Sequence, residues 1–315
     1  MGSITQNNLL PVIDFTGKTS NSGFTSWVST RDEVVRALEE YGCFIAIYDK
    51  VPLELRQDIL HASEELFNLP TETKVLNTSD SPAHGYVGGE PTVPLFESFG
   101  IENATTFEGV QKFTNVIWPS GNNNFSETAL SYSKLVAELN QVVLKMVSET
   151  YGVDKDCELL FGSMYYLLKM FKYHSPGENE KNMGLIPHTD ANFMSILHQG
   201  HVNGLEIKTK NGDWELVDSL FPTSFVVIAG DVCTAWTNGR IKAPHHRVMM
   251  SGNAERYSIG LFAFVRDLIV QVPKELVDDE HPLQFGPFDP YKYLLFCMTE
   301  GGRRSECKIK SYCGV

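Results

Sequence analysis

The stretch His188-Thr189-Asp190, followed far downstream by His246 and then by Arg256-Tyr257-Ser258, decides how this chain is interpreted. In an extended backbone the side-chain direction repeats every two residues, so His188 and Asp190 project from one side. A second imidazole, from His246, completes a face of two histidines and one carboxylate. This ligand set leaves about three coordination positions open and is typical of non-haem Fe(II) sites. Open positions indicate a catalytic metal rather than a structural one.

An H-x-D triplet alone is weak evidence, because nine histidines and 39 acidic residues make one such triplet expected by chance. The surroundings add weight. Ser251-Gly252-Asn253 is turn chemistry, so the chain is expected to reverse between His246 and Arg256. Their strands either pair or face each other from two sheets. Arg256 and Ser258 share a face, and a guanidinium beside a hydroxyl suits the carboxylate of a small dicarboxylic acid. A surface arginine on a strand is the alternative.

These motifs carry a likeness to a known family. The chain resembles the plant soluble 2-oxoglutarate and Fe(II)-dependent dioxygenases, whose pattern is H-T-D, then N-G-x-x-K-S-x-x-H-R-V, then R-x-S. Within that family it looks most like the glucosinolate side-chain oxygenases and the steroidal alkaloid hydroxylases. The matching stretches are Asn238–Val248, Pro11–Phe15, Tyr41–Phe44, Phe67–Pro70 and Ala229–Asp231.

The resemblance implies a fold and a reaction. The fold is mainly β with flanking helices: a double-stranded β-helix, or cupin-like jelly roll, with an N-terminal helical region. Members hold Fe(II), bind 2-oxoglutarate, use O2 with ascorbate as reductant, and release succinate and CO2. Asp190 argues against halogenation, because related halogenases vacate that position, and it leaves hydroxylation, desaturation or ring closure. The implied iron ligands and catalytic residues are His188, Asp190 and His246; the implied co-substrate anchors are Arg256, Ser258 and Tyr173.

The substrate pocket departs from the family pattern. Phe171 stands where relatives commonly have Asn, which removes a polar contact and extends the apolar wall. Phe262 and Phe264 share the face of Ser258, with core packing as the alternative. Lys169 lies where the family often has a basic residue, although it could equally face solvent. These residues predict a pocket for a small ring-bearing plant specialised metabolite such as an alkaloid or steroid.

Two other functions are compatible with the motifs. One is an ascorbate-dependent non-haem iron oxidase that does not use 2-oxoglutarate, and stoichiometric succinate release separates the two. The other is a non-catalytic metabolite-binding protein on the same scaffold. Among the remaining histidines, His245 is expected to point away from the metal because it adjoins His246. His198 and His201 are interpreted as solvated residues of a loop.

Composition is that of a cytoplasmic enzyme. The 315 residues, 42% of them apolar, can bury a sizeable core. The net charge of -13 argues against nucleic acid or an anionic membrane surface as a partner. A small-molecule substrate is what the resemblance implies, and a monomer is expected. Residues 1–6 show neither a basic region nor an apolar run, so no secretory signal is expected. Six cysteines without a C-x-x-C pair predict free thiols.

Helices are predicted early in the chain and strands later. A capping box at Thr30–Glu33 predicts a helix start, a second helix follows Pro52, and a third runs from Ser126 to Tyr151. Residues 71–125 are interpreted as a wandering segment with short strands. The expected regions are 1–160, helical and mixed, 161–271, the jelly-roll core, and 272–315, a segment across the barrel mouth. The predicted strands are Leu167–Tyr173, Leu205–Lys208, Trp214–Val217, Phe225–Ile228, His246–Met249 and Tyr257–Val265.

Overall fold

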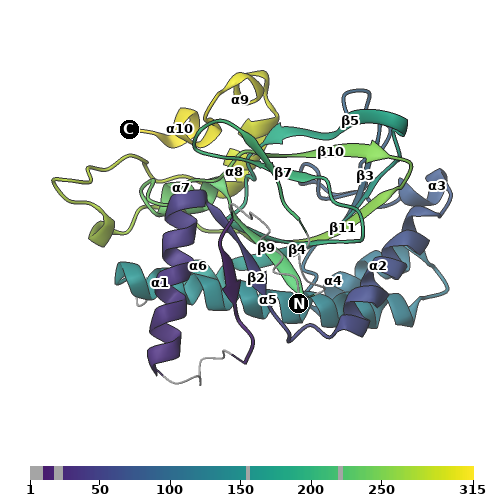
Figure 1. Cartoon of the computed structure of the whole chain (residues 1–315), viewed down its shortest axis with the longest axis horizontal. Helices are drawn as coiled ribbons and strands as arrows, with labels where there is room; N and C mark the ends of the chain where they lie inside the picture. The colour runs from purple at the N-terminus through teal and green to yellow at the C-terminus, as the bar shows by residue number, and fades with distance from the viewer. Residues whose placement is uncertain (1–9, 18–23, 154–156, 219–222) are drawn as a thin grey trace, which may run out of the picture.

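In the computed structural model two largely antiparallel sheets face each other, and helices cover the outside of one of them (Figure 1). The structure describes residues 10–17, 24–153, 157–218 and 223–315, without the side chains of 178–181. The strands are β1 (Val12–Asp14), β2 (Cys43–Ile47), β3 (Phe96–Ile101), β4 (Met164–Tyr173), β5 (Gly177–His188), β6 (Met194–Gln199), β7 (Leu205–Lys208), β8 (Trp214–Leu216), β9 (Ser224–Ala229), β10 (His246–Gly252) and β11 (Arg256–Val265).

Seven strands form the larger sheet in the order β1-β2-β9-β6-β11-β4-β3, and four form the smaller sheet in the order β5-β10-β7-β8. This is the double-sheet jelly roll that the sequence predicts. The turn after β10 carries the chain from the smaller sheet to the larger one, because β10 pairs with β5 and β7 whereas β11 pairs with β4 and β6. The strands that carry His246 and Arg256 therefore face each other from two sheets.

Helices pack mainly against the outer face of the larger sheet. The long helix α5 runs across it, with α1 and α2 beside α5 (Figure 1). The large apolar core lies between these helices and the sheet. The helices are α1 (Phe24–Tyr41), α2 (Leu53–Phe67), α3 (Thr71–Lys74), α4 (Phe107–Ile117), α5 (Asn123–Tyr151), α6 (Glu158–Gly162), α7 (Asp231–Trp236), the 3-10 helix η1 (Lys274–Leu276), α8 (Pro290–Met298), α9 (Glu300–Arg304) and α10 (Lys308–Cys313).

Two predicted helix boundaries agree with the structure and one does not. Helix α2 follows Pro52, and α5 ends at Gly152, whose φ of 68° is the left-handed conformation that glycine favours. The capping box does not start α1, which is already helical at Phe24. The Thr30 hydroxyl instead donates to the Ser26 carbonyl one turn earlier, as Ser and Thr side chains do inside helices.

The segment 71–125 is more ordered than predicted. It contains β3, α3 and α4, and the last begins where the Thr106 hydroxyl accepts from the Gly109 amide. The sequence also left β1, β2, β5 and β6 unassigned, although the six predicted strands are all present. Strands β1 to β3 precede residue 161, so the barrel recruits strands from the region predicted to be mainly helical. The three region boundaries remain a prediction.

Other expectations concern the chain as a whole. All six cysteines are free thiols, as predicted. No helix in the described ranges is long and apolar enough to span a membrane. The expectation that residues 1–6 carry no secretory signal lies outside the described residues.

Candidate active site

Three side chains meet at the end of the barrel where β5 stops and β10 begins. The Nε2 atoms of His188 and His246 each lie 3.6 Å from Oδ1 of Asp190. One ligand atom from each residue falls within 4.8 Å of the other two. Ligand atoms that each lie about 2.1 Å from one ion are roughly 3 to 4 Å apart, so this geometry fits a metal. The cross-strand pairing of His246 with His188 brings the two imidazoles together.

The hydrogen bonds of the two imidazoles favour metal binding. Nδ1 of His188 lies 2.8 Å from the Ile186 carbonyl, and Nδ1 of His246 lies 3.3 Å from the Pro244 carbonyl. A carbonyl can only accept, so each Nδ1 carries the proton and each Nε2 presents a lone pair. Burial, and then the neighbouring His188, lower the pKa of His246 to about 4, which keeps this ring neutral near neutral pH.

Asp190 is fixed by two further contacts. Its Oδ2 accepts a hydrogen bond of 2.5 Å from the Ser195 hydroxyl, which leaves Oδ1 toward the histidines. Burial alone would raise the pKa of Asp190, but His246, His188 and Ser195 together hold that pKa well below its ordinary value. The carboxyl group is therefore ionised, as a metal ligand must be.

Asp231, of the Ala229-Gly230-Asp231 motif, holds the segment from His188 to Asp190 in place through hydrogen bonds. Its Oδ2 accepts from the Thr189 hydroxyl at 3.0 Å and from the Tyr293 hydroxyl at 2.5 Å. Its own amide donates to the Asp190 carbonyl at 2.7 Å. Thr189 thus points away from His188 and Asp190, as the period of two predicts, and helix α8 is tied to the metal face through Tyr293.

Arg256, the first residue of β11, places a buried cation inside the barrel. Arg256 is only 2% exposed, and it donates to Ser258 at 3.0 Å and to Gln199 at 2.8 Å. Both partners are neutral, and its Nε has no hydrogen-bond partner. In the described part of the chain no carboxylate pairs with it, although such groups are the usual partners of a buried guanidinium. The carboxylate of a ligand would therefore fit beside Arg256. The ring of Tyr173 lies against the guanidinium group, with its centre 4.9 Å from the guanidinium carbon.

The inner face of β3, β4 and β11 forms an aromatic wall, which we define as Phe96, Phe171, Tyr173 and Phe262. Phe171 and Phe262 are each 9% exposed and meet edge to face, with ring centroids 6.1 Å apart. Phe96 lies against both Phe171 and Tyr173, at 6.0 and 5.5 Å. The predicted residues Phe171 and Phe262 thus lie together between the two sheets, in one apolar cluster.

Phe264 and Lys169 also lie at this face. Phe264 is only partly buried and packs on His84, with centroids 4.7 Å apart. Lys169 is 8% exposed and donates to the Ala83 carbonyl at 2.7 Å. The alternative that Lys169 faces solvent is therefore wrong.

The structure separates the remaining histidines. His245 is exposed and stands outside the cluster of ligand atoms, as predicted, and His201 is also exposed. The prediction that His198 is a solvated loop residue is wrong, because His198 belongs to β6 and is 5% exposed. Its ring packs between Tyr132 and Phe225, at 6.1 and 5.7 Å, and burial lowers its pKa to about 3.

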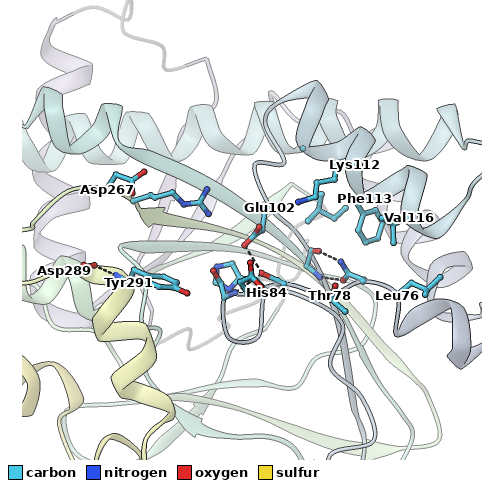
Figure 2. Close-up of a pocket in the computed structure, with 18 of the residues that line it drawn as sticks. Leu76, Thr78, His84, Glu102, Lys112, Phe113, Val116, Asp267, Asp289 and Tyr291 are labelled. Carbon is cyan, nitrogen blue, oxygen red and sulfur yellow. Dashed lines mark hydrogen bonds between the residues drawn. The ribbon is translucent and has the colours of Figure 1, made fainter.

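A pocket of 810 Å³ opens beside the barrel rather than at the metal face (Figure 2). Side chains of both charge signs surround it, Lys112 and Asp267 among them. His84 belongs to its lining and also contacts Phe264, so this one buried imidazole separates the pocket from the inner face of β11.

Sequence reasoning missed Ser195 and Gln199, which hold Asp190 and Arg256. Both point inward from β6, a strand that the sequence left unassigned because Gln199-Gly200 resembles a loop. Once β6 is known, its pairing places Gln199 opposite Ser258 and Ser195 opposite Phe262. The sequence offered no local signal for them, because β6 is buried on both faces and shows no alternation of polar and apolar residues.

The arrangement as a whole can hold a metal with open positions at one end and a dicarboxylic acid that reaches from the metal to Arg256. Comparisons with known proteins agree. A family model described as the 2OG-Fe(II) oxygenase superfamily matches residues 163–265, and one described as the N-terminal region of the non-haem dioxygenases in morphine synthesis matches residues 10–107.

Individual relatives match over nearly the whole chain. A probable 2-oxoglutarate-dependent dioxygenase of Arabidopsis thaliana, AOP1.2, is 40% identical over 96% of this chain and 95% of its own length. The crystal structure of a rice dioxygenase for auxin oxidation has a TM-score of 0.82 and 29% identity, over 97% of this chain and all of that one. The Arabidopsis thaliana counterpart in complex with 2-oxoglutarate has a TM-score of 0.78 and 27% identity, over 87% of this chain and 100% of that one.

Proposed function

Because this chain belongs to the 2OG-Fe(II) oxygenase superfamily, we propose that it oxidises a C–H bond of a small ring-bearing plant specialised metabolite, such as an alkaloid or steroid. The protein is an iron- and 2-oxoglutarate-dependent dioxygenase with a small-molecule substrate. When bound, iron would activate O2, which supplies the oxidising power, and 2-oxoglutarate would be oxidised to succinate and CO2.

The residues divide this work between the two ends of the barrel. His188, Asp190 and His246 would hold iron through two Nε2 atoms and one carboxylate oxygen. Arg256 and Ser258 would bind the far carboxylate of 2-oxoglutarate, with Tyr173 closing the apolar side of that anchor. Burial excludes water from Arg256, which strengthens each charge-assisted hydrogen bond to a bound carboxylate.

The aromatic wall is the observation that carries the proposed substrate. Phe171 and Phe262 meet edge to face between the two sheets, and rings of a ligand prefer the same edge or offset contacts. Phe171 replaces the amide that relatives commonly place there, so the wall offers shape and apolar contact rather than hydrogen bonds. These features favour a metabolite that buries rings and presents one C–H to the metal face.

A panel of plant metabolites tests this proposal. Each compound is added with Fe(II), 2-oxoglutarate and ascorbate, and succinate and oxidised product are measured together. We expect ring-bearing compounds to stimulate succinate release above the substrate-free rate, and Asp190→Ala to remove that response. Stimulation confined to ring-free polar compounds would overturn the assignment. Product masses separate hydroxylation, which adds one oxygen atom, from desaturation and ring closure, which remove two hydrogens.

A further inference from the structure

Lys169 is a buried cation on the inner face of β4. It shares this face with Leu167 and Phe171, both members of the apolar cluster between the sheets. Its ammonium lies 5.5 Å from the ring centre of Phe171 and donates to the Ala83 carbonyl at 2.7 Å. The ammonium therefore lies on the inner side of the larger sheet, beside the ring of Phe171.

The charge on Lys169 has no carboxylate partner in the described part of the chain. An ammonium has three N–H donors, and the Ala83 carbonyl accepts one of them. Burial lowers the pKa of Lys169 to about 8, although the more distant charge of Asp190 acts in the opposite direction.

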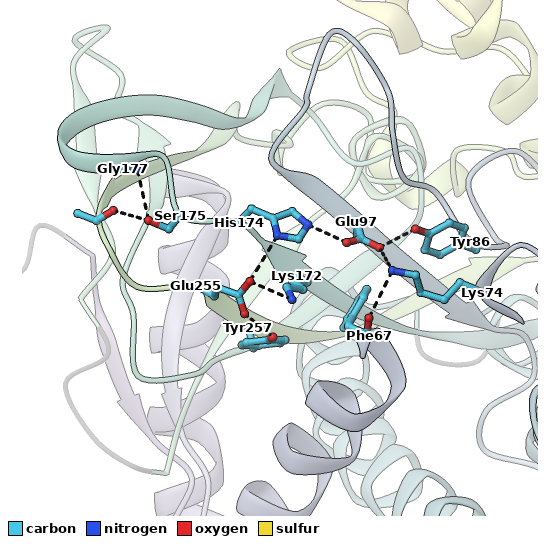
Figure 3. Close-up of polar contacts among 11 residues, drawn as sticks. Phe67, Lys74, Tyr86, Glu97, Lys172, His174, Ser175, Gly177, Glu255 and Tyr257 are labelled. Carbon is cyan, nitrogen blue, oxygen red and sulfur yellow. Dashed lines mark hydrogen bonds and ion pairs between the residues drawn. The ribbon is translucent and has the colours of Figure 1, made fainter. Parts of the chain in front are cut away.

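Two buried lysines on the outer side of the same sheet each form an ion pair with a carboxylate, as buried ammonium groups usually do (Figure 3). Lys74 is 7% exposed and pairs with Glu97 at 2.6 Å. Lys172, also 7% exposed, pairs with Glu255 at 2.9 Å. Each buried ammonium there has a carboxylate, whereas Lys169, which points into the barrel, has a backbone carbonyl.

The neighbouring strands offer Lys169 no side-chain partner. Its cross-strand neighbours are Gly260 on β11 and Gly100 on β3. A Cβ at Gly260 would lie 2.5 Å from the Phe262 ring, so the missing side chain lets that ring lie over the strand beside the lysine. The ammonium thus has the Phe171 ring beside it and no opposing side chain on either neighbouring strand, on the face where the substrate is proposed to bind.

We propose that Lys169 is a specificity-determining residue that pairs with a single oxyanion of the substrate, either a carboxylate or a sulfate. This inference rests on the proposed function and narrows its substrate class to ring compounds with one acid group. The acid group of the substrate would form the ion pair that no side chain of the described residues forms with Lys169, while the rings of the substrate contact Phe171 and Phe262. A cationic alkaloid without an acid group would instead bring two like charges together.

A purely structural role of Lys169 is the alternative, because its hydrogen bond to the Ala83 carbonyl also ties the segment around residue 83 to the barrel. The two roles differ in what they do to binding. A purely structural tie would affect acidic and neutral ligands alike, whereas a charge partner would distinguish them. The discriminating quantity is therefore the ratio of affinities for an acid and its neutral counterpart, not either affinity alone.

The test uses matched probes with the full-length protein loaded with Fe(II) and 2-oxoglutarate under anaerobic conditions. Calorimetric dissociation constants are measured for naphthalene-2-acetate against its primary amide, and for 2-naphthyl sulfate against 2-naphthol. We expect at least one acid to bind more tightly than its neutral counterpart, by about 10-fold or more. This factor is the contribution expected of one charge-assisted hydrogen bond. The two pairs separate carboxylate from sulfate recognition.

The variants complete the test. Lys169→Met should bring the preferred acid and its neutral counterpart to within about twofold of each other, since it removes one hydrogen bond to a charged group. Lys172→Met, the control on the outer side of the sheet, should keep the wild-type ratio. The proposal is overturned if neither acid binds wild type better than its counterpart, or if Lys169→Met weakens both members equally. Failure of the proposed function would appear separately, as acid-selective binding without succinate release by any ring compound.

Discussion

His245 and His246 are neighbours in sequence, but only the second has its Nε2 beside Asp190. Replacing His188, Asp190 or His246 by Ala should abolish bound iron and succinate formation while the protein stays folded, because each removes one metal ligand. His245→Ala is the matched control and should retain both, since that side chain is exposed. Iron content by metal analysis, with circular dichroism for the fold, is the measurement. Iron loss in His245→Ala alone would show that the strand register is different.

Arg256 tests the co-substrate anchor. Lysine keeps the charge but loses the planar fork that donates to Ser258 and Gln199. Loss of a charge-assisted hydrogen bond costs about 1.5 to 3 kcal/mol, so the KM for 2-oxoglutarate should rise roughly 10- to 150-fold in Arg256→Lys. Tyr173→Phe should raise it less. An unchanged KM in Arg256→Lys would place the anchor for 2-oxoglutarate elsewhere.

Phe262 tests the aromatic wall at the level of one ring. Its removal should raise the KM for the true substrate about 10-fold or more, because a buried aromatic contact contributes roughly 1.5 to 3 kcal/mol. Substrate-free turnover of 2-oxoglutarate should persist, since the variant keeps the three metal ligands and Arg256. Both constants are measured in the same preparation. A variant that weakens 2-oxoglutarate and spares the substrate would assign Phe262 to the co-substrate site.

At the scale of elements, a polar network joins α3, β3, β4 and β11 across the outer face of the larger sheet (Figure 3). Glu97 on β3 is its centre and accepts from Lys74, Tyr86 and His174 at 2.6, 2.5 and 2.7 Å. Burial would raise the pKa of Glu97, but these three partners together lower it below 4.5. A carboxyl group whose pKa is lower in the folded state stabilises the fold above its unfolded pKa and stops doing so as the pH falls through the folded pKa.

Glu97→Gln should therefore lower the free energy of unfolding near neutral pH, by about 1 to 3 kcal/mol for a charged acceptor lost to a buried lysine. It should also flatten the decline of stability below pH 4.5, because one titrating group is gone. Urea unfolding at neutral and acidic pH measures both effects. The exposed Glu300→Gln is the control, and an equal acid slope in wild type and Glu97→Gln would contradict the linkage.

Elements also show how far sequence reasoning could reach. Six strands, the start of α2 and the end of α5 were predictable, because alternation, Pro and Gly mark them locally. Strand β6 was not, because its pattern is buried on both faces: Ile196 and His198 point to the helices while Ser195 points into the barrel. A histidine that aromatic rings surround has no local signature that separates it from a solvated one. Helix α4 was missed because the Pro- and Gly-rich residues before it hid its cap at Thr106.

For the whole molecule, the metal face and the anchor lie on different sheets, yet both were predictable because each depends on a short motif with a period of two. The supporting contacts were not. Ser195 and Gln199 act across strands, and the tie between Asp231 and Tyr293 joins residues 62 positions apart. Lys169 had two open interpretations, and only the packing of the barrel decided between them.

Because the motifs lie on two sheets, ligands that reach both should stabilise the whole fold. β10 of the smaller sheet supplies His246, and β11 of the larger sheet supplies Arg256, so 2-oxoglutarate bound to a metal would link them. At about a hundredfold excess over Kd a ligand stabilises by roughly 2.7 kcal/mol, which corresponds to an increase in Tm of about 5 °C for a chain of this size.

Anaerobic thermal unfolding can separate the two ligands. Wild type stripped of metal should gain stability with Fe(II) and again with 2-oxoglutarate. Arg256→Lys should keep the first increment and lose most of the second, whereas His246→Ala should lose both, because without metal the keto-acid end has no partner. If Arg256→Lys kept the full second increment, 2-oxoglutarate would not link the two sheets through this residue, and the division of the site between opposite ends of the barrel would be wrong.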